Sequence, residues 1–204
     1  ALFAWRRTSR STLYFGLYCL LWMVNYACSD TSDWVVRLAL PGLGAGVADP
    51  AALISFFLSI PVGYRFFRSL YPGEFPRAVQ TLSDVLAGVF SLLVLALPLR
   101  TALAVVPVYY ATSSGLIFYC LFMLHRALRR GREGAQFILA GFIILGLAGM
   151  NDMLLDIGVV HSVPLIPVGM FVYILFQSLA LARLFSRAFT AVEHLSSELE
   201  DKNR

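Results

Sequence analysis

A series of apolar runs, each close to the length that crosses a lipid bilayer, constrains this chain more than any other feature. The runs cover about residues 12–29, 50–71, 80–97, 101–124, 135–157 and 163–182, and Arg clusters or Gly- and Pro-containing segments separate them. About 20 apolar residues in a helix cross the hydrocarbon core of a bilayer. Because the runs are continuous rather than alternating, they favour helices over the strands of a membrane barrel.

Composition supports the same class of fold. Of all residues 59% are hydrophobic and only 14% are charged, whereas a soluble domain carries about a quarter charged residues. The sequence therefore predicts an all-α, polytopic transmembrane helix bundle. Residues 1–5 are apolar and are followed by Arg6 and Arg7, so we interpret them as the end of a further, truncated span. Six complete spans and this truncated one make seven.

The distribution of positive charge predicts the orientation in the membrane. Of the 16 Lys and Arg residues, only Arg37 and Arg100 lie on one predicted side, and all the others lie on the opposite side. By the positive-inside rule the Arg-rich side is cytoplasmic, and so is the C-terminus. We therefore predict a multi-pass membrane protein whose C-terminus is cytoplasmic. The net charge of +4 reflects this asymmetry and does not indicate a nucleic-acid partner.

The C-terminal tail has the spacing of a coiled coil. Neither Gly nor Pro separates the last span from the tail, in which apolar residues follow a 3-4-3-4 spacing: Phe185, Ala188, Val192, Leu195 and Leu199. These are the a and d positions of a two-stranded coiled coil. The sequence predicts a bundle over residues 1–184 and the start of a cytoplasmic, homodimeric signalling helix over residues 185–204. Because two heptads are short, an amphipathic helix on the membrane surface is the alternative.

Polar residues near one end of the fifth complete span form the candidate sensing site. Asp152 and Asp156 are four residues apart and share a helix face; Asn151 is adjacent, and His161 follows just beyond. Ionisable groups are costly in a membrane, which makes them candidates for function. We predict a ligand, cation or proton-sensing site at these four residues. The alternative is that Asn151 and Asp152 bond a neighbouring helix while Asp156 lies at the interface.

Other polar and small residues are expected to join helices. Asn25, Asp84 and Gln177 are predicted to form interhelical hydrogen bonds, Asp84 with an arginine such as Arg77 or Arg126. Small residues at the surface of a membrane helix allow a second helix to approach closely; we expect this role for Gly141, Gly146 and Gly149. Residues 30–49 form a long Gly-containing segment that serves either ligand contact or simple connection.

The sequence contains no catalytic motif. His194 lacks the surrounding residues of a kinase phosphoacceptor, and the chain has no Gly-rich phosphate loop, no cyclase signature and no Cys or His cluster for a metal. Lys202 is the only lysine and lies outside every predicted span, which excludes a retinal Schiff base within the bundle. We therefore predict no catalytic residue, no metal and no cofactor in this chain.

Several segments resemble one known family. They are YFGLY at residues 14–18, NDMLLD at 151–156, LIPVGMF at 165–171, FQSL at 176–179 and FSRAFTAVEHLSSELEDKN at 185–203. They resemble the bacterial seven-transmembrane receptors with diverse intracellular signalling modules. The resemblance implies a location in the bacterial inner membrane and a sensor domain before the first helix. It also implies a histidine kinase or a diguanylate, adenylate or guanylate cyclase after the tail.

The expected function is therefore that of a membrane sensor and transducer. It would relay an extracytoplasmic signal through the last span and the coiled coil to a cytoplasmic output domain. The expected partners are a second copy of the chain, the lipid bilayer, and an unknown ligand or N-terminal sensor domain. A small-molecule transporter or channel subunit is one alternative, although we find no internal repeat with paired broken helices. A structural subunit of a membrane assembly is another.

Overall fold

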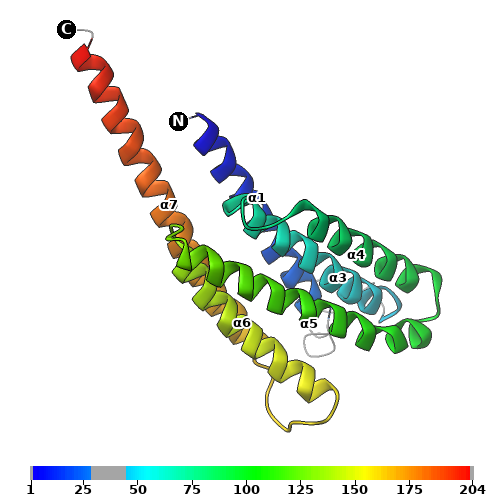
Figure 1. Ribbon diagram of the computed structural model, residues 1–204. Coiled ribbons are helices and arrows are strands. Elements are labelled where there is room, and N and C mark those ends of the chain that lie inside the picture. Colours follow the sequence, from blue (N-terminus) through cyan, green and yellow to red (C-terminus); the bar gives the residue numbers. More distant parts are fainter. Residues whose placement is uncertain (1, 29–44, 203–204) are drawn as a thin grey trace. The chain divides into compact units, whose positions relative to one another are not determined.

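The computed structural model describes residues 2–28 and 45–202, and these residues form helices and turns without a strand. The helices follow the chain as α1 (Leu2–Ala27), α3 (Ala45–Leu70), α4 (Arg77–Ala96), α5 (Leu99–Arg129), α6 (Ala135–Asp156) and α7 (Ile166–Lys202) (Figure 1). Among the described residues, five helices are long and apolar enough to cross a membrane, namely α3 to α7. The prediction of an all-helical, multi-pass membrane protein is confirmed.

The first helix differs from the prediction. The truncated span at residues 1–5 and the first complete span were expected to be separate, but Leu2–Ala27 form one continuous helix. The basic segment between them contains neither Gly nor Pro, so nothing in it stops a helix. The predicted interruption is wrong, and the described helices do not reach the expected count of seven spans. Much of the segment between α1 and α3, residues 29–44, lies outside the described residues.

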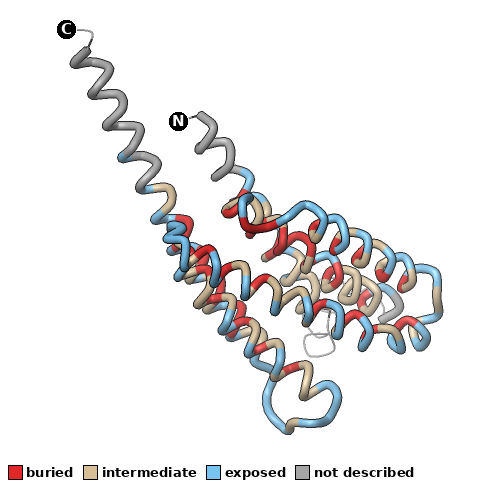
Figure 2. Tube along the Cα trace, viewed as in Figure 1, coloured by how far each residue is buried: buried red, intermediate tan, exposed pale blue. Residues whose placement is uncertain are grey.

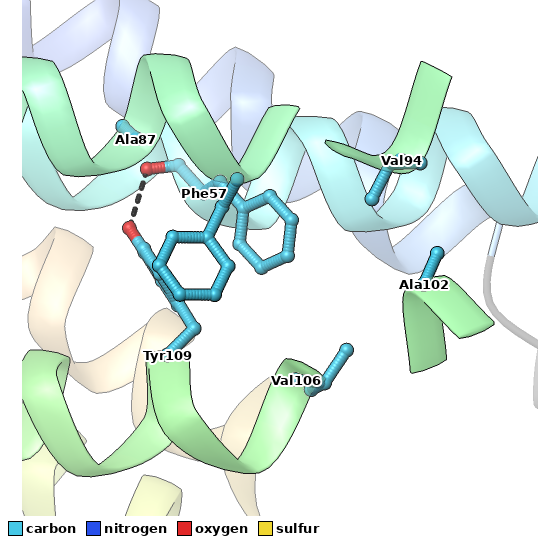
Figure 3. Packing of buried hydrophobic residues seen from close by; sticks show 7 residues of the cluster. Phe57, Ala87, Val94, Ala102, Val106 and Tyr109 are labelled. Carbon is cyan, nitrogen blue, oxygen red and sulfur yellow. Dashed lines mark hydrogen bonds between the residues drawn. The ribbon is translucent and has the colours of Figure 1, made fainter. Parts of the chain in front are cut away.

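The chain divides into two compact units. The first covers Ser9–Leu116 and is built around Phe57 of α3. The Phe57 ring lies 4.4 Å from the Tyr109 ring of α5 and 5.7 Å from the Phe90 ring of α4, measured between centroids. Figure 3 shows Phe57 and Tyr109 among the smaller side chains of the core. The buried cluster comprises Phe57, Ala87, Phe90, Val94, Ala102, Val106 and Tyr109.

The second unit covers Ile117–Arg204 together with Ala1–Thr8, and α6 and α7 pack against each other within it. The buried residues of α6 follow steps of three and four, which place them on one face: Ala135, Ile138, Gly141, Leu145, Ala148 and Asp152. Figure 2 shows buried positions along both helices where they lie side by side. Leu147 of α6 and Phe171 of α7 are 63% and 64% exposed, as is usual for side chains that face lipid.

Candidate functional site

The candidate site lies where α6 ends and the connector to α7 begins. Gly158 has a φ of +73°, a conformation that favours glycine. Its N–H donates to the Leu155 carbonyl at 3.0 Å, and the N–H of Val159 donates to the Leu154 carbonyl at 2.9 Å. These two bonds form a Schellman motif, which ends α6 and turns the chain into the connector, residues 157–165.

Asp152 joins the end of α6 to the start of α7. Its Oδ1 accepts the N–H of Leu165 at 2.6 Å, and its Oδ2 accepts the N–H of Ile166 at 2.9 Å. Pro164 and Pro167 flank these two residues and have no N–H to donate. The carboxylate therefore binds the amides available at the beginning of α7, where the helix dipole also favours a negative charge. The residue is only 9% exposed.

Asn151 holds the connector beside this carboxylate. Its Nδ2 donates to the Val163 carbonyl at 3.0 Å and to Asp152 Oδ1 at 2.9 Å, while Ser162 Oγ donates to Asn151 Oδ1 at 2.7 Å. We call Asn151, Asp152 and Ser162 the connector cluster. Both Asp152 oxygens are engaged by donors from the chain itself, so the described geometry is that of a polar joint between two helices.

The other two candidate residues lie apart from these bonds. Asp156 is exposed in the last turn of α6, and His161 is exposed in the connector. Among the described residues, no group of three or more His, Cys, Asp or Glu side chains could hold a metal ion. The sequence analysis missed Ser162 and the two backbone amides. The two prolines that bracket Leu165 and Ile166 are the signal that could have identified them, because they mark the start of a helix with few amide donors.

Glycine contacts bring α6 and α7 close together below the connector cluster. A Cβ added to Gly169 of α7 would lie 2.6 Å from the Cβ of Ala148, and one added to Gly141 of α6 would lie 2.8 Å from the Cβ of Phe176. Neither distance is sterically possible without movement. Gly146 and Gly149 were expected to take the same role, but a Cβ on either would meet nothing within 4 Å. Gly169 was not anticipated.

Polar and aromatic contacts continue to the far end of this helix pair. Gln177 is completely buried, and its Nε2 donates to the Ile138 carbonyl at a distance of 3.5 Å. The guanidinium carbon of Arg183 lies 4.5 Å from the centre of the Phe137 ring, a cation–π geometry. Contacts between α6 and α7 thus extend from Asp152 to Phe137, over most of the length of α6.

Two further polar residues join helices within the Ser9–Leu116 unit. Asn25 of α1 donates to the Ala52 carbonyl of α3 at 2.9 Å. Asp84 of α4 forms an ion pair with Arg65 of α3 at 2.8 Å, an arginine that the sequence analysis did not name as its partner. Gln80 Nε2 also donates to Asp84, at 2.9 Å. These contacts connect α1 with α3 and α3 with α4.

The tail is helical as far as Lys202, because α7 is one uninterrupted helix from Ile166. Phe185, the first residue of the predicted coiled-coil seam, is half-buried. The side chains of Ala188, Val192, Leu195 and Leu199 lie outside the described residues. Figure 1 shows α7 continuing beyond the first residues of α6.

A comparison with known families shows to which of them the chain is similar. The family described as 7TM diverse intracellular signalling matches residues 1–183. No curated protein and no solved structure matches the chain.

Proposed function

Because this chain belongs to the 7TM diverse intracellular signalling family, we propose that it relays a signal across the membrane through its last helix. The chain is the membrane module of a signalling receptor. In our proposal the signal comes from the extracytoplasmic side, as a ligand or as movement of an N-terminal sensor domain. The receiver is a cytoplasmic output domain, a histidine kinase or a nucleotide cyclase.

The length of α7 is the observation that carries this proposal. The helix has 37 residues, which at 1.5 Å per residue is about 55 Å. The hydrocarbon core is about 30 Å thick, so about 25 Å of the same helix extends beyond it. Ile166–Ser186 forms the part apolar enough to cross the membrane. A continuous helix that crosses and leaves the bilayer can transmit a change in its position or rotation.

The contacts between α6 and α7 support a movement of these two helices together. A shift of α7 along its own axis by one residue, about 1.5 Å, would break the hydrogen bonds of 2.6 and 2.9 Å from Leu165 and Ile166 to Asp152. It would also force Ala148 out of its position against Gly169. Packed helices resist such sliding because they rest in discrete arrangements. We therefore propose that α6 and α7 move together as one hairpin.

The connector cluster is the proposed point of input. It holds residues 162–166 to the end of α6 through the hydrogen bonds described above, and the exposed residues Asp156 and His161 lie beside and within the connector. A ligand or sensor domain that binds the connector would act directly on the start of α7. The proposed output is pairing of two α7 tails along Phe185, Ala188, Val192, Leu195 and Leu199, on the side that the arginine distribution assigns to the cytoplasm.

Insertions into the tail test the relay in the full-length receptor. Seven residues inserted after Thr190 preserve the heptad phase, whereas four residues rotate everything beyond the insertion relative to the membrane part. We expect the variant with the seven-residue insertion to keep regulated output activity in membranes. The four-residue insertion should abolish this activity or fix it at one level that no longer responds to the stimulus. If the two variants showed the same regulated output activity, the signal would not depend on the rotation of the tail helix, and the proposed relay would be refuted.

Disulfide cross-linking tests the pairing separately. In a variant without Cys19, Cys28 and Cys120, Leu195→Cys is expected to form covalent dimers in native membranes, and Ser197→Cys, on the opposite face of the heptad, is not. If both cysteines react equally or not at all, the tail does not pair through this seam. An amphipathic helix on the membrane surface would then be the better account.

A further inference from the structure

A basic surface lies at the junction of α5 and α6. The segment contains four arginines, Arg126, Arg129, Arg130 and Arg132, against one acidic residue, Glu133, and all five are exposed. Gly131 has a φ of +66°, and the N–H of Arg132 donates to the Ala127 carbonyl at 3.0 Å. This turn ends α5 and holds Arg132 three residues before α6 begins. The surface is therefore an ordered basic turn.

On α5, two exposed phenylalanines precede the arginines and share a helix face with two of them. Phe118 and Phe122 are 59% and 60% exposed. Steps of four, four and three residues connect Phe118, Phe122, Arg126 and Arg129, so these four side chains share one helix face. Because α5 is apolar enough to cross a membrane, a bilayer whose headgroups meet the arginines would place the two phenylalanines beside the lipid chains.

The start of α6 adds to the positive potential. Its N-cap residue is Gly134, which provides no side-chain hydrogen bond, and its first turn contains no acidic residue. The positive end of the helix dipole is therefore not neutralised from within α6. Arg132 lies two residues before this N-cap, where its charge and the dipole reinforce each other.

We propose that this surface binds the headgroup of an anionic phospholipid, with the acyl chain lying along Phe118 and Phe122. Arginine has a planar guanidinium that binds phosphate oxygens in pairs, which suits it to phosphodiester headgroups. A free phosphate would use the arginines but would gain nothing from the two aromatic side chains. Phe118 and Phe122 are therefore the feature that assigns the site to a lipid. This inference is independent of the proposed signalling function.

Lipid retention by the full chain tests the proposal. The protein in detergent is mixed with phosphatidylglycerol, which is anionic, or phosphatidylcholine, which is zwitterionic, and native mass spectrometry gives the lipids retained. We expect the wild type to prefer phosphatidylglycerol. The double variant Arg129→Gln/Arg132→Gln should weaken its binding about 25-fold, since each arginine near a charged headgroup contributes about fivefold, or about 1 kcal/mol. Arg100→Gln, an exposed arginine at the opposite end of α5, is the matched control and should not change binding.

Two further measurements distinguish the contribution of the acyl chain to binding from the contribution of the headgroup charge. Phe122→Ala should weaken phosphatidylglycerol binding while leaving the stabilising effect of inorganic phosphate on Tm unchanged. Raising the salt concentration should weaken retention by the wild type, which tests the charge contribution without any substitution. Equal retention of the two lipids by the wild type would overturn the proposal, as would equal losses in the double variant and in Arg100→Gln. Stabilisation by inorganic phosphate equal to that by phosphatidylglycerol would show a simple anion site instead.

Discussion

The Tyr109 hydroxyl donates a 2.7 Å hydrogen bond to the backbone carbonyl of Phe57, which lies four residues before Pro61 (Figure 3). In a regular helix the N–H of residue 61 would donate to that carbonyl, but proline has no N–H. Tyr109 of α5 supplies the missing donor from 52 residues away in the sequence. Helix α3 continues through Pro61, because a second helix satisfies the carbonyl that the proline leaves free.

Tyr109→Phe should therefore destabilise the protein by about 1–3 kcal/mol, because it leaves a buried carbonyl without a donor. Thermal unfolding in detergent measures the effect. In a Pro61→Ala background, residue 61 regains its N–H and the same substitution should cost less. Equal costs in both backgrounds would show that the hydroxyl does not replace the donor missing at Pro61.

Gly169→Ala and Gly141→Ala should each destabilise the contact between α6 and α7 by about 1–3 kcal/mol, because their new methyl groups overlap Ala148 and Phe176. Gly146→Ala and Gly149→Ala are the matched controls. They add the same group where nothing lies within 4 Å and should be neutral or slightly stabilising, because alanine favours helix. Combining Gly169→Ala with Ala148→Gly should restore stability. A loss of the same size at all four glycines would contradict the assigned contact.

Asp152→Asn should lower stability by about 1–3 kcal/mol, because the amide group offers one acceptor oxygen where two backbone donors require acceptors. It should leave membrane insertion intact and alter the response of the full-length receptor to its stimulus. The charge-matched control is Asp156→Asn, one turn further along and exposed, where the stability change should be smaller. An unchanged stimulus response in Asp152→Asn would remove the connector cluster as the point of input.

The ion pair between Arg65 and Asp84 should contribute little on its own. Its side chains are 40% and 32% exposed, and pairs of this kind contribute less than about 1 kcal/mol. Asp84→Asn should lower Tm only slightly at low salt, and the difference from the wild type should shrink as salt screens the pair. A large, salt-independent loss would instead assign the effect to the hydrogen bond from Gln80, which is buried.

The membrane class and the positions of most helices follow from the sequence. Continuous apolar runs must form helices in a bilayer, since only then are the backbone groups satisfied within the segment. Gly134 and Gly158 in the sequence predict where α6 begins and ends, and Gly134 also marks the turn between α5 and α6. No comparable residue predicts the limits of α1. Arginines near a span predict orientation and do not interrupt a helix, so Arg6 and Arg7 were wrongly interpreted as the end of a separate, truncated span.

The sequence by itself determined that this chain is a helical membrane module of a receptor family with a long last helix, because these features depend on local runs of residues. Only the tertiary structure determined which residues of different helices contact one another. Among four glycines in α6 and α7, only Gly141 and Gly169 lie at helix contacts, and this depends on how each helix is rotated against the other. The sequence alone showed that Asp152 is an ionisable residue whose burial in a membrane costs free energy. Only the folded connector brings the amides of Leu165 and Ile166 to its carboxylate. Contacts between residues distant in sequence are set by helix packing, which no local pattern specifies.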